Sequence, residues 1–368
     1  MLADFAAPGD KPAGGPQVAV GRLVQELSKR SVDVVVVAPD PGRSRSAAVE
    51  LDGGGTLVTV PTGERWNLAR NLQPWRRGAR ALVERLGADI VHGQSLLPGG
   101  IAAAGIEGRP RVVTARGNMR ADTIARYSGF GAVVRARQRD RLARLAVEHA
   151  DVVVGVNPEW TVNVPERPKR FAYIPNIVGT EFFDRPRTPE PGRVLFAGGT
   201  RQIKGWALLA AAWPRVVQAV PNASLHVVGW SSDEPPPGIP PDLRGSVLVE
   251  GALSSAELAD RMTHAAALVI PSLFEVSPIV LAEAWAMGLP VAAVRVGGIP
   301  ALATGAAVLV ERELDGLVEG LVAVLSGGDE IDRHVAEGRR RADAHRADAV
   351  TAAHISLYEE LAHAFGSA

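Results

Sequence analysis

Residues 271–293 read PSLFEVSPIVLAEAWAMGLPVAA, an apolar segment that keeps two glutamates, Glu275 and Glu283, with seven residues between them. The residues that lead into it, ALVIPS, read as a buried strand ending in a turn. Ser277 followed by Pro278 predicts a helix start, because serine is a preferred N-cap and proline suits the first helical position. The two carboxylates therefore bracket a helix N-terminus.

A helix N-terminus in this position favours an anionic ligand. The free N–H groups from Ile279 onward and the positive end of the helix dipole would attract a group such as phosphate. Each glutamate would then be free to accept hydrogen bonds from hydroxyl groups on either side of that phosphate. An ordinary structural role, with Glu275 solvated and Glu283 salt-bridged in a helix that covers the sheet, explains this segment equally well.

The composition excludes several classes of function. The chain has 368 residues, with 40 basic and 40 acidic side chains, so nucleic acid and anionic membrane are not expected as main partners. There is no cysteine, and the eight histidines show no paired ligand spacing, so we expect no thiolate chemistry and no metal site. Only four of the basic residues are lysines, which makes each lysine worth inspecting.

The sequence predicts a soluble, cytoplasmic protein. No apolar run approaches the ~18 residues that a transmembrane helix needs, and MLADFAAPGDKPAGG at the start does not look like a signal peptide. Residues 74–86, PWRRGARALVERL, predict a basic amphipathic helix. A solvated helix face is the favoured interpretation of that segment, and peripheral contact with the inner face of a membrane is the alternative.

Short apolar runs alternate with helical periods along the chain. The runs are rich in β-branched residues and apolar on both faces, as buried parallel strands are, and residues 20–27 show the helical spacing typical of the intervals. We therefore predict an α/β fold with right-handed crossovers. The predicted strands are residues 32–39, 88–93, 111–117, 150–156, 193–199, 223–229, 246–251, 267–272 and 289–294.

The interval 157–192 has the least regular pattern and is rich in proline and charge, so it reads as a short strand followed by a linker. A boundary there leaves two Rossmann-like domains, residues 1–180 and 181–349, whose C-terminal strand edges can face each other across a cleft. Such a cleft is the default ligand site. Residues 350–368 predict a helix that returns to pack on the first domain.

Two glycine-containing turns point to phosphate. After the strand VLFAGG, Gly198 and Gly199 let a backbone approach a ligand, and Lys204, with Arg201 nearby, could bind phosphate as a point charge. A solvated residue at a helix start is the alternative role for Lys204. In the first half, Gly14 and Gly15 precede a proline and predict a second anion-binding helix start. Together these features suggest a diphosphate ligand that also carries sugars.

These segments resemble the retaining glycosyltransferases of family four, whose two Rossmann-like domains form the arrangement called GT-B. The resemblance covers nearly the whole chain and is most specific from residue 193 to 302. It is carried by FAGGTRQIKG, PNASLHVVG, VLVEGALSSAELADRM and AALVIPSLFEVSPIVLAEAWAMGLPVAAVRVGGIPAL, and in the first half by GGPQVAVGRLVQELSKRSVDVVVVAP, ADIVHGQSLLPGGIAA, VVTARG and YIPNIV. It implies transfer of a sugar from a nucleotide-diphosphate sugar to an acceptor hydroxyl, with retention of anomeric configuration and without a metal or other cofactor.

The resemblance also implies residue roles. In relatives, the glutamate at the place of Glu275 contacts hydroxyls of the transferred sugar, and the one at the place of Glu283 contacts the ribose. Lys204 would neutralise the charge that grows as the sugar–phosphate bond breaks. Catalytic roles thus fall on Lys204, Arg201 and Glu275, and donor contacts on Gly14, Gly15, Gly198, Gly199, Val276, Ser277, Ile279 and Glu283.

Four features depart from the family pattern. The family usually has arginine at the place of Gly199, so Arg201 would have to supply that charge. The family usually has a glycine-rich sequence after the first glutamate, but this chain has VSP at residues 276–278, and Pro278 lacks an N–H donor. The family commonly has a Thr-x-His-Gly pattern in the first half, and in this chain Arg116 takes the place of its histidine. Only MLADFA precedes the glycine loop, so the first strand is nearly absent, and a misplaced start or a trimmed chain is the favoured explanation.

His92, Arg116 and Asn118 lie near strand ends that are expected to face the cleft, and they are candidate acceptor contacts. A satisfied polar residue at a strand end explains His92 and Asn118 equally well. The acceptor class stays open among sugars, lipids and natural products. Two other functions remain as alternatives: a nucleotide-sugar 2-epimerase of the same architecture, and a non-catalytic protein that closes two lobes on a sugar.

Overall fold

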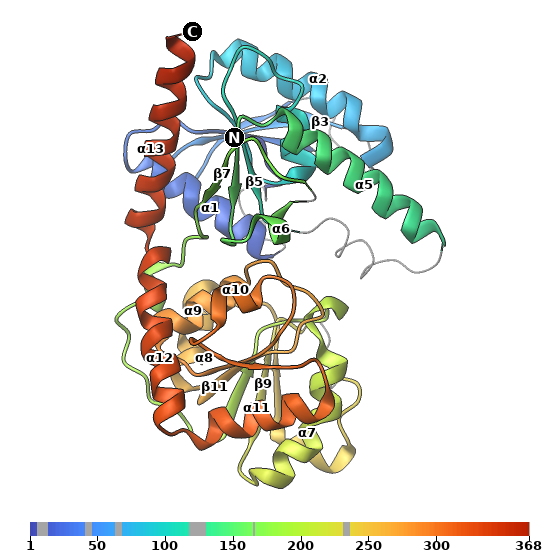
Figure 1. Ribbon diagram of the computed structural model, residues 1–368, viewed down its shortest axis with the longest axis vertical. Coiled ribbons are helices and arrows are strands. Elements are labelled where there is room, and N and C mark those ends of the chain that lie inside the picture. Colours follow the sequence, from blue (N-terminus) through green and yellow to red (C-terminus); the bar gives the residue numbers. More distant parts are fainter. Residues whose placement is uncertain are drawn as a thin grey trace. The chain divides into compact units, whose positions relative to one another are not determined.

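The computed structural model describes residues 1–5, 14–40, 46–62, 68–117, 130–164, 166–230 and 236–367. The chain divides into two compact units, each built around a largely parallel sheet (Figure 1). Unit 1 comprises Met1–Ile177 and Ala347–Ala368, and unit 2 comprises Val178–Arg346. For comparison, the boundary predicted from the sequence follows residue 180, and the returning segment was expected from residue 350.

The sheet of unit 1 has two parts, joined by the first residues of the chain. One part has the order β1-β3-β2 and the other β4-β5-β6-β7, with only β2 antiparallel. Leu2 forms parallel bridges to Val37 on one side and Gly93 on the other, so Met1–Ala3 occupy the place of the nearly absent first strand. The strands are β1 (Val35–Asp40), β2 (Ala48–Glu50), β3 (Thr56–Pro61), β4 (Val91–Gly93), β5 (Arg111–Ala115), β6 (Val152–Gly155) and β7 (Phe171–Tyr173).

The helices of unit 1 bury apolar faces against this sheet. In α1 the predicted face of Val20, Leu23, Val24 and Leu27 is buried. In α2 the apolar residues Trp75, Ala79, Leu82 and Val83 are also buried, so the face left to solvent is the polar one. The helices are α1 (Gly15–Ser28), α2 (Leu68–Leu86), η1 (Leu96–Gly100), α3 (Ile101–Ala103), α5 (Phe130–His149), α6 (Trp160–Asn163) and α13 (Ala347–Gly366).

The C-terminal helix α13 belongs to the core of unit 1. Val350, His354, Leu357 and Leu361 are buried on one face, as their spacing predicts. The three apolar members of this face pack in one cluster with residues of α1, β1 and β6 (Figure 1). The last helix therefore stabilises a sheet whose strands come from the first half of the sequence.

Unit 2 is a six-stranded parallel sheet with the order β10-β9-β8-β11-β12-β13. The order reverses between β8 and β11, which makes the carboxyl ends of these two strands the topological switch point where doubly wound folds bind ligands. The strands are β8 (Arg193–Phe196), β9 (Ser224–Val228), β10 (Val247–Glu250), β11 (Ala267–Ile270), β12 (Val291–Val294) and β13 (Val308–Val310).

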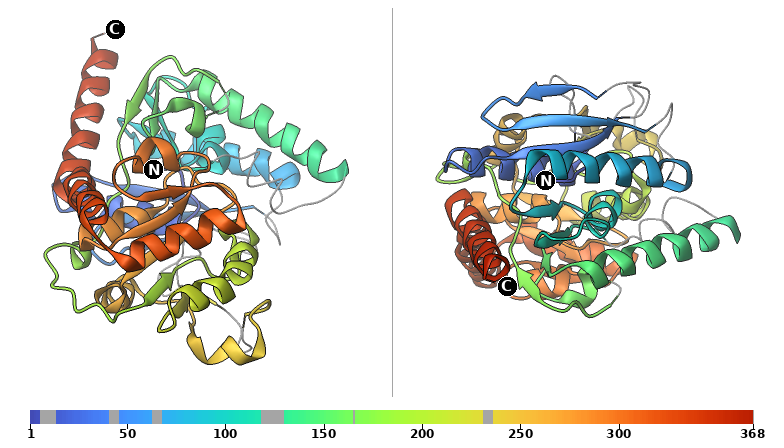
Figure 2. Two further views of the ribbon diagram at one scale, coloured as in Figure 1. Left: turned by 60° about the horizontal axis from the view of Figure 1, so that its bottom comes forward. Right: turned by 90° about the horizontal axis from the view of Figure 1, so that it is seen from above.

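Helices cover both faces of this sheet, which explains why its central strands are apolar throughout (Figure 2). Leu195 and Leu268 face α9 and its Trp285, whereas Val194 and Val269 pack in the cluster that contains α7 and α11. The helices are η2 (Thr180–Phe182), η3 (Gln202–Lys204), α7 (Trp206–Ala219), η4 (Pro241–Ser246), α8 (Ser255–His264), α9 (Ile279–Met287), α10 (Ile299–Ala303), α11 (Leu314–Ser326), α12 (Asp329–Ala342) and η5 (Asp343–His345).

Among the described residues, no helix is both long enough and apolar enough to cross a membrane.

Replacing Leu357 by alanine should destabilise unit 1, because the substitution leaves a cavity between α13 and the core. Leu→Ala changes at buried sites cost about 2–5 kcal/mol, and Leu357 is buried in the cluster. Urea-induced unfolding followed by circular dichroism would measure the loss. Glu359→Ala, at an exposed position of the same helix, is the control and should change stability by less than ~0.5 kcal/mol. Equal effects of the two changes would show that α13 does not support the unit.

Candidate functional site

Two residues with predicted catalytic roles meet at the switch point of unit 2. Lys204 lies at the end of η3, after β8, and Glu275 lies on the loop between β11 and α9. The Nζ atom of Lys204 is 2.6 Å from Oε1 of Glu275, and the two side chains are only 19% and 12% exposed. A half-buried ion pair thus links the loops that follow the two central strands.

The close approach of these loops depends on Gly205. This residue has a left-handed backbone, with φ of 78°, and a Cβ atom there would lie 1.8 Å from the carbonyl oxygen of Pro271. The N–H of Leu273 also donates to the carbonyl of Ile203 at 2.8 Å. Only glycine allows this contact, and the contact brings Lys204 within reach of Glu275.

Ser272 is a site residue that sequence reasoning missed. It is 1% exposed, and its hydroxyl donates to Oε1 of Glu275 at 2.8 Å. Ser272 and Lys204 therefore share one carboxylate oxygen, and within the described part of the chain no hydrogen bond to the other oxygen, Oε2, is present. The signal in the sequence was a serine two residues after a buried strand and three residues before the glutamate.

The helix that separates the two glutamates begins one residue later than predicted. Pro278 is the N-cap residue of α9, with φ of −67° and ψ of 119°, so it is not the first helical residue, and Ser277 is not the cap. The extended ψ of Pro278 places Ile279 first in the helix, while the carbonyl of Pro278 accepts from the N–H of Leu281 at 3.1 Å. Glu283 lies on α9 and is 5% exposed, so it is held by the protein rather than by solvent.

The two glycines after β8 leave no room for a side chain, and each is restricted by a different neighbour. Gly199 has a φ of 59°, and a Cβ atom there would lie 2.6 Å from the carbonyl oxygen of Gly229. The family that the sequence resembles usually has arginine at this position. In this chain an arginine would strain the backbone and displace the residue that follows β9. At Gly198, a Cβ atom would lie 2.1 Å from the ring of Phe196. Arg201 is exposed and makes no ion pair with any described residue.

In unit 1 the predicted glycines lie at a helix start, as expected. Gly14 is the N-cap residue of α1, Gly15 is its first residue, and Pro16 follows. The N-terminus of α1 is therefore formed by small residues. Anion binding at this terminus stays a prediction.

His92 and Arg116 lie in a polar cluster inside unit 1. The Nε2 atom of His92 is 2.7 Å from the hydroxyl of Thr114, and its Nδ1 atom is 2.6 Å from the hydroxyl of Tyr358. Burial lowers the pKa of His92 well below its usual value, so the ring is neutral. His92 is 2% exposed, which fits the alternative of a satisfied polar residue at a strand end. Its contact with an acceptor stays a prediction.

Arg116 is held by neutral partners. It donates to the side-chain oxygen of Asn176 and, at 2.8 Å, to that of Gln94. Burial lowers the pKa of Arg116 to about 10, so the side chain keeps its positive charge at neutral pH. Among the described residues no carboxylate pairs with it. The third acceptor candidate, Asn118, lies outside the described residues.

Comparison with known families identifies both halves of the chain. Residues 13–182 match the model described as Glycosyltransferase Family 4, and residues 191–327 match the model described as Glycosyl transferases group 1. The chain belongs to glycosyltransferase family 4. The prediction of this family from the sequence is thus confirmed, and the chain is a sugar-transferring enzyme.

Curated relatives cover most of the glycosyltransferase chain. A D-inositol 3-phosphate glycosyltransferase of Nocardiopsis dassonvillei is 29% identical over 332 residues, which cover 79% of this chain and 76% of that protein. One from Corynebacterium diphtheriae is 24% identical over 331 residues, covering 80% and 76% of the two chains.

Solved structures confirm the GT-B fold. A sucrose-phosphate synthase from Thermosynechococcus elongatus matches with a TM-score of 0.80 at 19% identity, covering 99% of both chains. The glycosyltransferase WaaG matches with a TM-score of 0.69 at 20% identity, covering 99% of this chain and 98% of that one. Anabaena Alr3699/HepE, solved in complex with UDP, matches at 0.70 and 13% identity, covering 98% and 99%.

Introducing the family's usual arginine at Gly199 should destabilise unit 2. A left-handed backbone costs a residue with a side chain about 1–2 kcal/mol, and the contact with Gly229 adds to this. Thermal unfolding should show a lower midpoint for Gly199→Arg. Gly245→Arg is the matched control, because a Cβ atom there meets nothing within 4 Å. An unchanged midpoint for Gly199→Arg would mean that the loop accepts the family residue.

Proposed function

We propose that this enzyme transfers a sugar from a nucleoside-diphosphate sugar to an acceptor hydroxyl with retention of anomeric configuration and without a metal ion or other cofactor. The observation that carries the proposal is the Lys204–Glu275 pair at the switch point of unit 2, in which Lys204 lies after β8 and Glu275 lies on the loop leading into α9. This arrangement offers a cation, a carboxylate and a helix N-terminus for a donor that has a sugar on one side of a diphosphate.

The donor would use the groups around the N-terminus of α9. The backbone N–H groups of Val276, Ser277 and Ile279 are candidate diphosphate contacts. Lys204 has three N–H donors, so it can keep its bond to Glu275 and still donate to a phosphate oxygen. Oε2 of Glu275 would accept from a sugar hydroxyl, and Glu283 would accept from the ribose.

Retention fits a reaction on one face of the sugar. The bond from the anomeric carbon to the diphosphate oxygen breaks, and the acceptor oxygen bonds to the anomeric carbon from the same side. The acceptor's proton passes to the departing phosphate oxygen. Lys204, with Arg201, would stabilise the negative charge that develops on this leaving group, which is the role that a metal ion has in other transferases.

The acceptor would bind to unit 1. The curated relatives carry a name that includes a phosphorylated polyol, inositol 3-phosphate. In unit 1, Arg116 provides a positive charge that no described carboxylate compensates. We therefore propose an acceptor that carries hydroxyl groups and an anionic group, with Arg116 as the contact for the anion. His92 would act through the cluster that orients Arg116 and Gln94.

Nucleotide binding should separate the roles of the two glutamates. Glu283→Ala should weaken the binding of nucleoside diphosphates by the loss of a charge-assisted hydrogen bond, about 1.5–3 kcal/mol. Glu275→Ala should leave that affinity nearly unchanged and lower turnover of the nucleotide sugar, because its partner is the sugar. Calorimetric titration with UDP, ADP and GDP, together with turnover assays, would measure both effects. Equal losses of affinity in the two variants would refute this division of roles, and no binding of any nucleotide by the unmodified protein would refute the donor class.

Removing Lys204 should affect the chemical step. Loss of one preorganised donor at a developing oxyanion typically lowers turnover ~10²–10³-fold, so we expect Lys204→Ala to fall in this range and Arg201→Ala to have a milder effect. Donor consumption should be unchanged by a chelator in both the variant and the unmodified enzyme. Near-normal turnover of Lys204→Ala would place the diphosphate elsewhere. Activity that requires a divalent metal would contradict the assigned mode of leaving-group stabilisation.

A further inference from the structure

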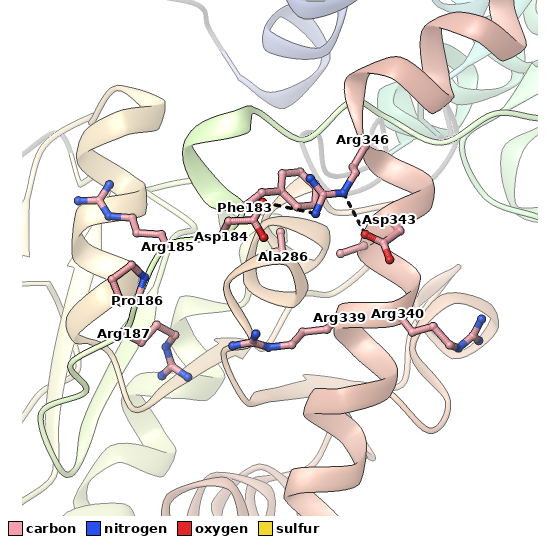
Figure 3. Close-up of a pocket in the computed structure, with 11 residues that line it drawn as sticks. Phe183, Asp184, Arg185, Pro186, Arg187, Ala286, Arg339, Arg340, Asp343 and Arg346 are labelled. Atoms are coloured by element: carbon pink, nitrogen blue, oxygen red, sulfur yellow. Dashed lines mark hydrogen bonds and ion pairs between the residues drawn. The ribbon is translucent and has the colours of Figure 1, made fainter.

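Unit 2 contains a cavity of about 760 Å³ (Figure 3), and neither Lys204 nor Glu275 is among the residues that line it. It lies beside the end of α9, and its walls come from residues 183–187 and 339–346. These two segments lie near the points at which the chain enters and leaves unit 2. Five of the eleven lining residues are arginines and two are aspartates, so the cavity is strongly basic.

Three of the five arginines have carboxylate partners. Arg185 pairs with Asp260 at 3.0 Å, Arg340 with Glu337 at 2.7 Å, and Arg346 with Asp343 at 3.0 Å. Arg346 also covers the ring of Phe183 at 4.1 Å. The charge of these three side chains is therefore compensated within the protein.

The other two arginines, Arg187 and Arg339, have no carboxylate partner among the described residues, and they point toward each other (Figure 3). Arg187 donates to the carbonyl oxygens of Gly288 and Ala265, both at 2.6 Å, while its Nε atom is buried without an acceptor. Burial, together with the charge of Arg339, lowers the pKa of Arg187 to about 10. The pair thus holds two like charges near each other.

Helix capping explains only part of this arrangement. The carbonyls that Arg187 satisfies lie at the C-terminal ends of α8 and α9, and each helix end carries only about half a negative charge. Arg339 reaches the carbonyl of Met287 at 3.5 Å, which is too long for a strong hydrogen bond. Two full positive charges facing a cavity therefore exceed the negative charge that the helix ends supply.

We propose that this cavity binds a small phosphorylated molecule, a phosphate monoester or a diphosphate, with its phosphate group between Arg187 and Arg339. Guanidinium groups match phosphate oxygens by paired N–H donors, and a bridging anion would remove the repulsion between the two arginines. The volume lies in the range of small-molecule sites, about 300–1,000 Å³, and exceeds what a free phosphate ion would fill. A ligand there would hold together the two segments that border the entry and exit of unit 2.

Pyrophosphate is a suitable probe, because it has the diphosphate chemistry of the proposed ligand. Calorimetric titration at about 0.15 M salt suppresses diffuse attraction to exposed charges. Carrying it out in a Lys204→Ala background removes the main cation of the proposed donor site. In that background we expect saturable binding that Arg339→Gln weakens about tenfold or more, because one of the two paired donors is lost.

Arg340→Gln provides the matched control. Arg340 is the next residue of the same helix, but it points away from the two facing arginines and pairs with Glu337 (Figure 3). Although Arg340 also lines the cavity, it does not face the proposed phosphate position, so Arg340→Gln should reduce pyrophosphate affinity far less than Arg339→Gln does. Arg187→Gln would remove contacts to two helix ends, so the exposed Arg339 is the better position for the test.

Two results would overturn the proposal. One is the absence of saturable binding in the Lys204→Ala background, and the other is an equal loss of affinity in Arg339→Gln and Arg340→Gln, which would indicate diffuse attraction to a basic surface. The proposal does not depend on the donor assignment. Nucleoside diphosphate binding by the unmodified enzyme tests that assignment separately, so failure of either proposal can be recognised on its own.

Discussion

The ion pair between Lys204 and Glu275 is the interaction on which the site in unit 2 depends. It exists because Gly205 lets the loop after β8 touch the carbonyl of Pro271 at the end of β11. Breaking a half-buried pair leaves one charge without its partner, which costs more than an exposed pair contributes. The ion pair therefore stabilises the contact between the two loops, and the backbone conformations of both loops determine where Glu275 lies.

The orientation of Glu275 follows from a second contact. Ser272 and Lys204 both bind Oε1, so the carboxylate cannot rotate without losing two donors. A charged acceptor with two donors on one oxygen presents the other oxygen in a fixed direction. Preorganisation of this kind is what makes a carboxylate useful for a sugar hydroxyl, because no reorganisation is required when the donor binds.

The sequence predicted features that depend on local pattern, and it could not predict those that depend on distant contacts. Buried parallel strands and the spacing of the glutamates are local, and the strands of unit 2 lie where apolar runs predicted them, apart from β13. β2 and β3 were missed because glycines and short length obscure their alternation. The burial of His92 could not be predicted, since Tyr358, which binds its ring, is 266 residues away in the sequence. The start of α9 was predicted one residue early, because serine followed by proline gives two adjacent start signals.

The chain has 36 arginines and only four lysines, so the use of lysine rather than arginine at position 204 calls for a physical reason. Arginines repeatedly bind backbone carbonyls at helix ends: Arg187 binds those of Ala265 and Gly288, and Arg341 that of Thr304. A planar guanidinium suits this task, because its donors have fixed directions. In the function proposed above, the cation at the switch point would serve both the carboxylate of Glu275 and a phosphate that arrives from another direction. A compact ammonium with three donors on a flexible stem meets that requirement better, which gives a physical reason for lysine at position 204 in a chain that mostly uses arginine.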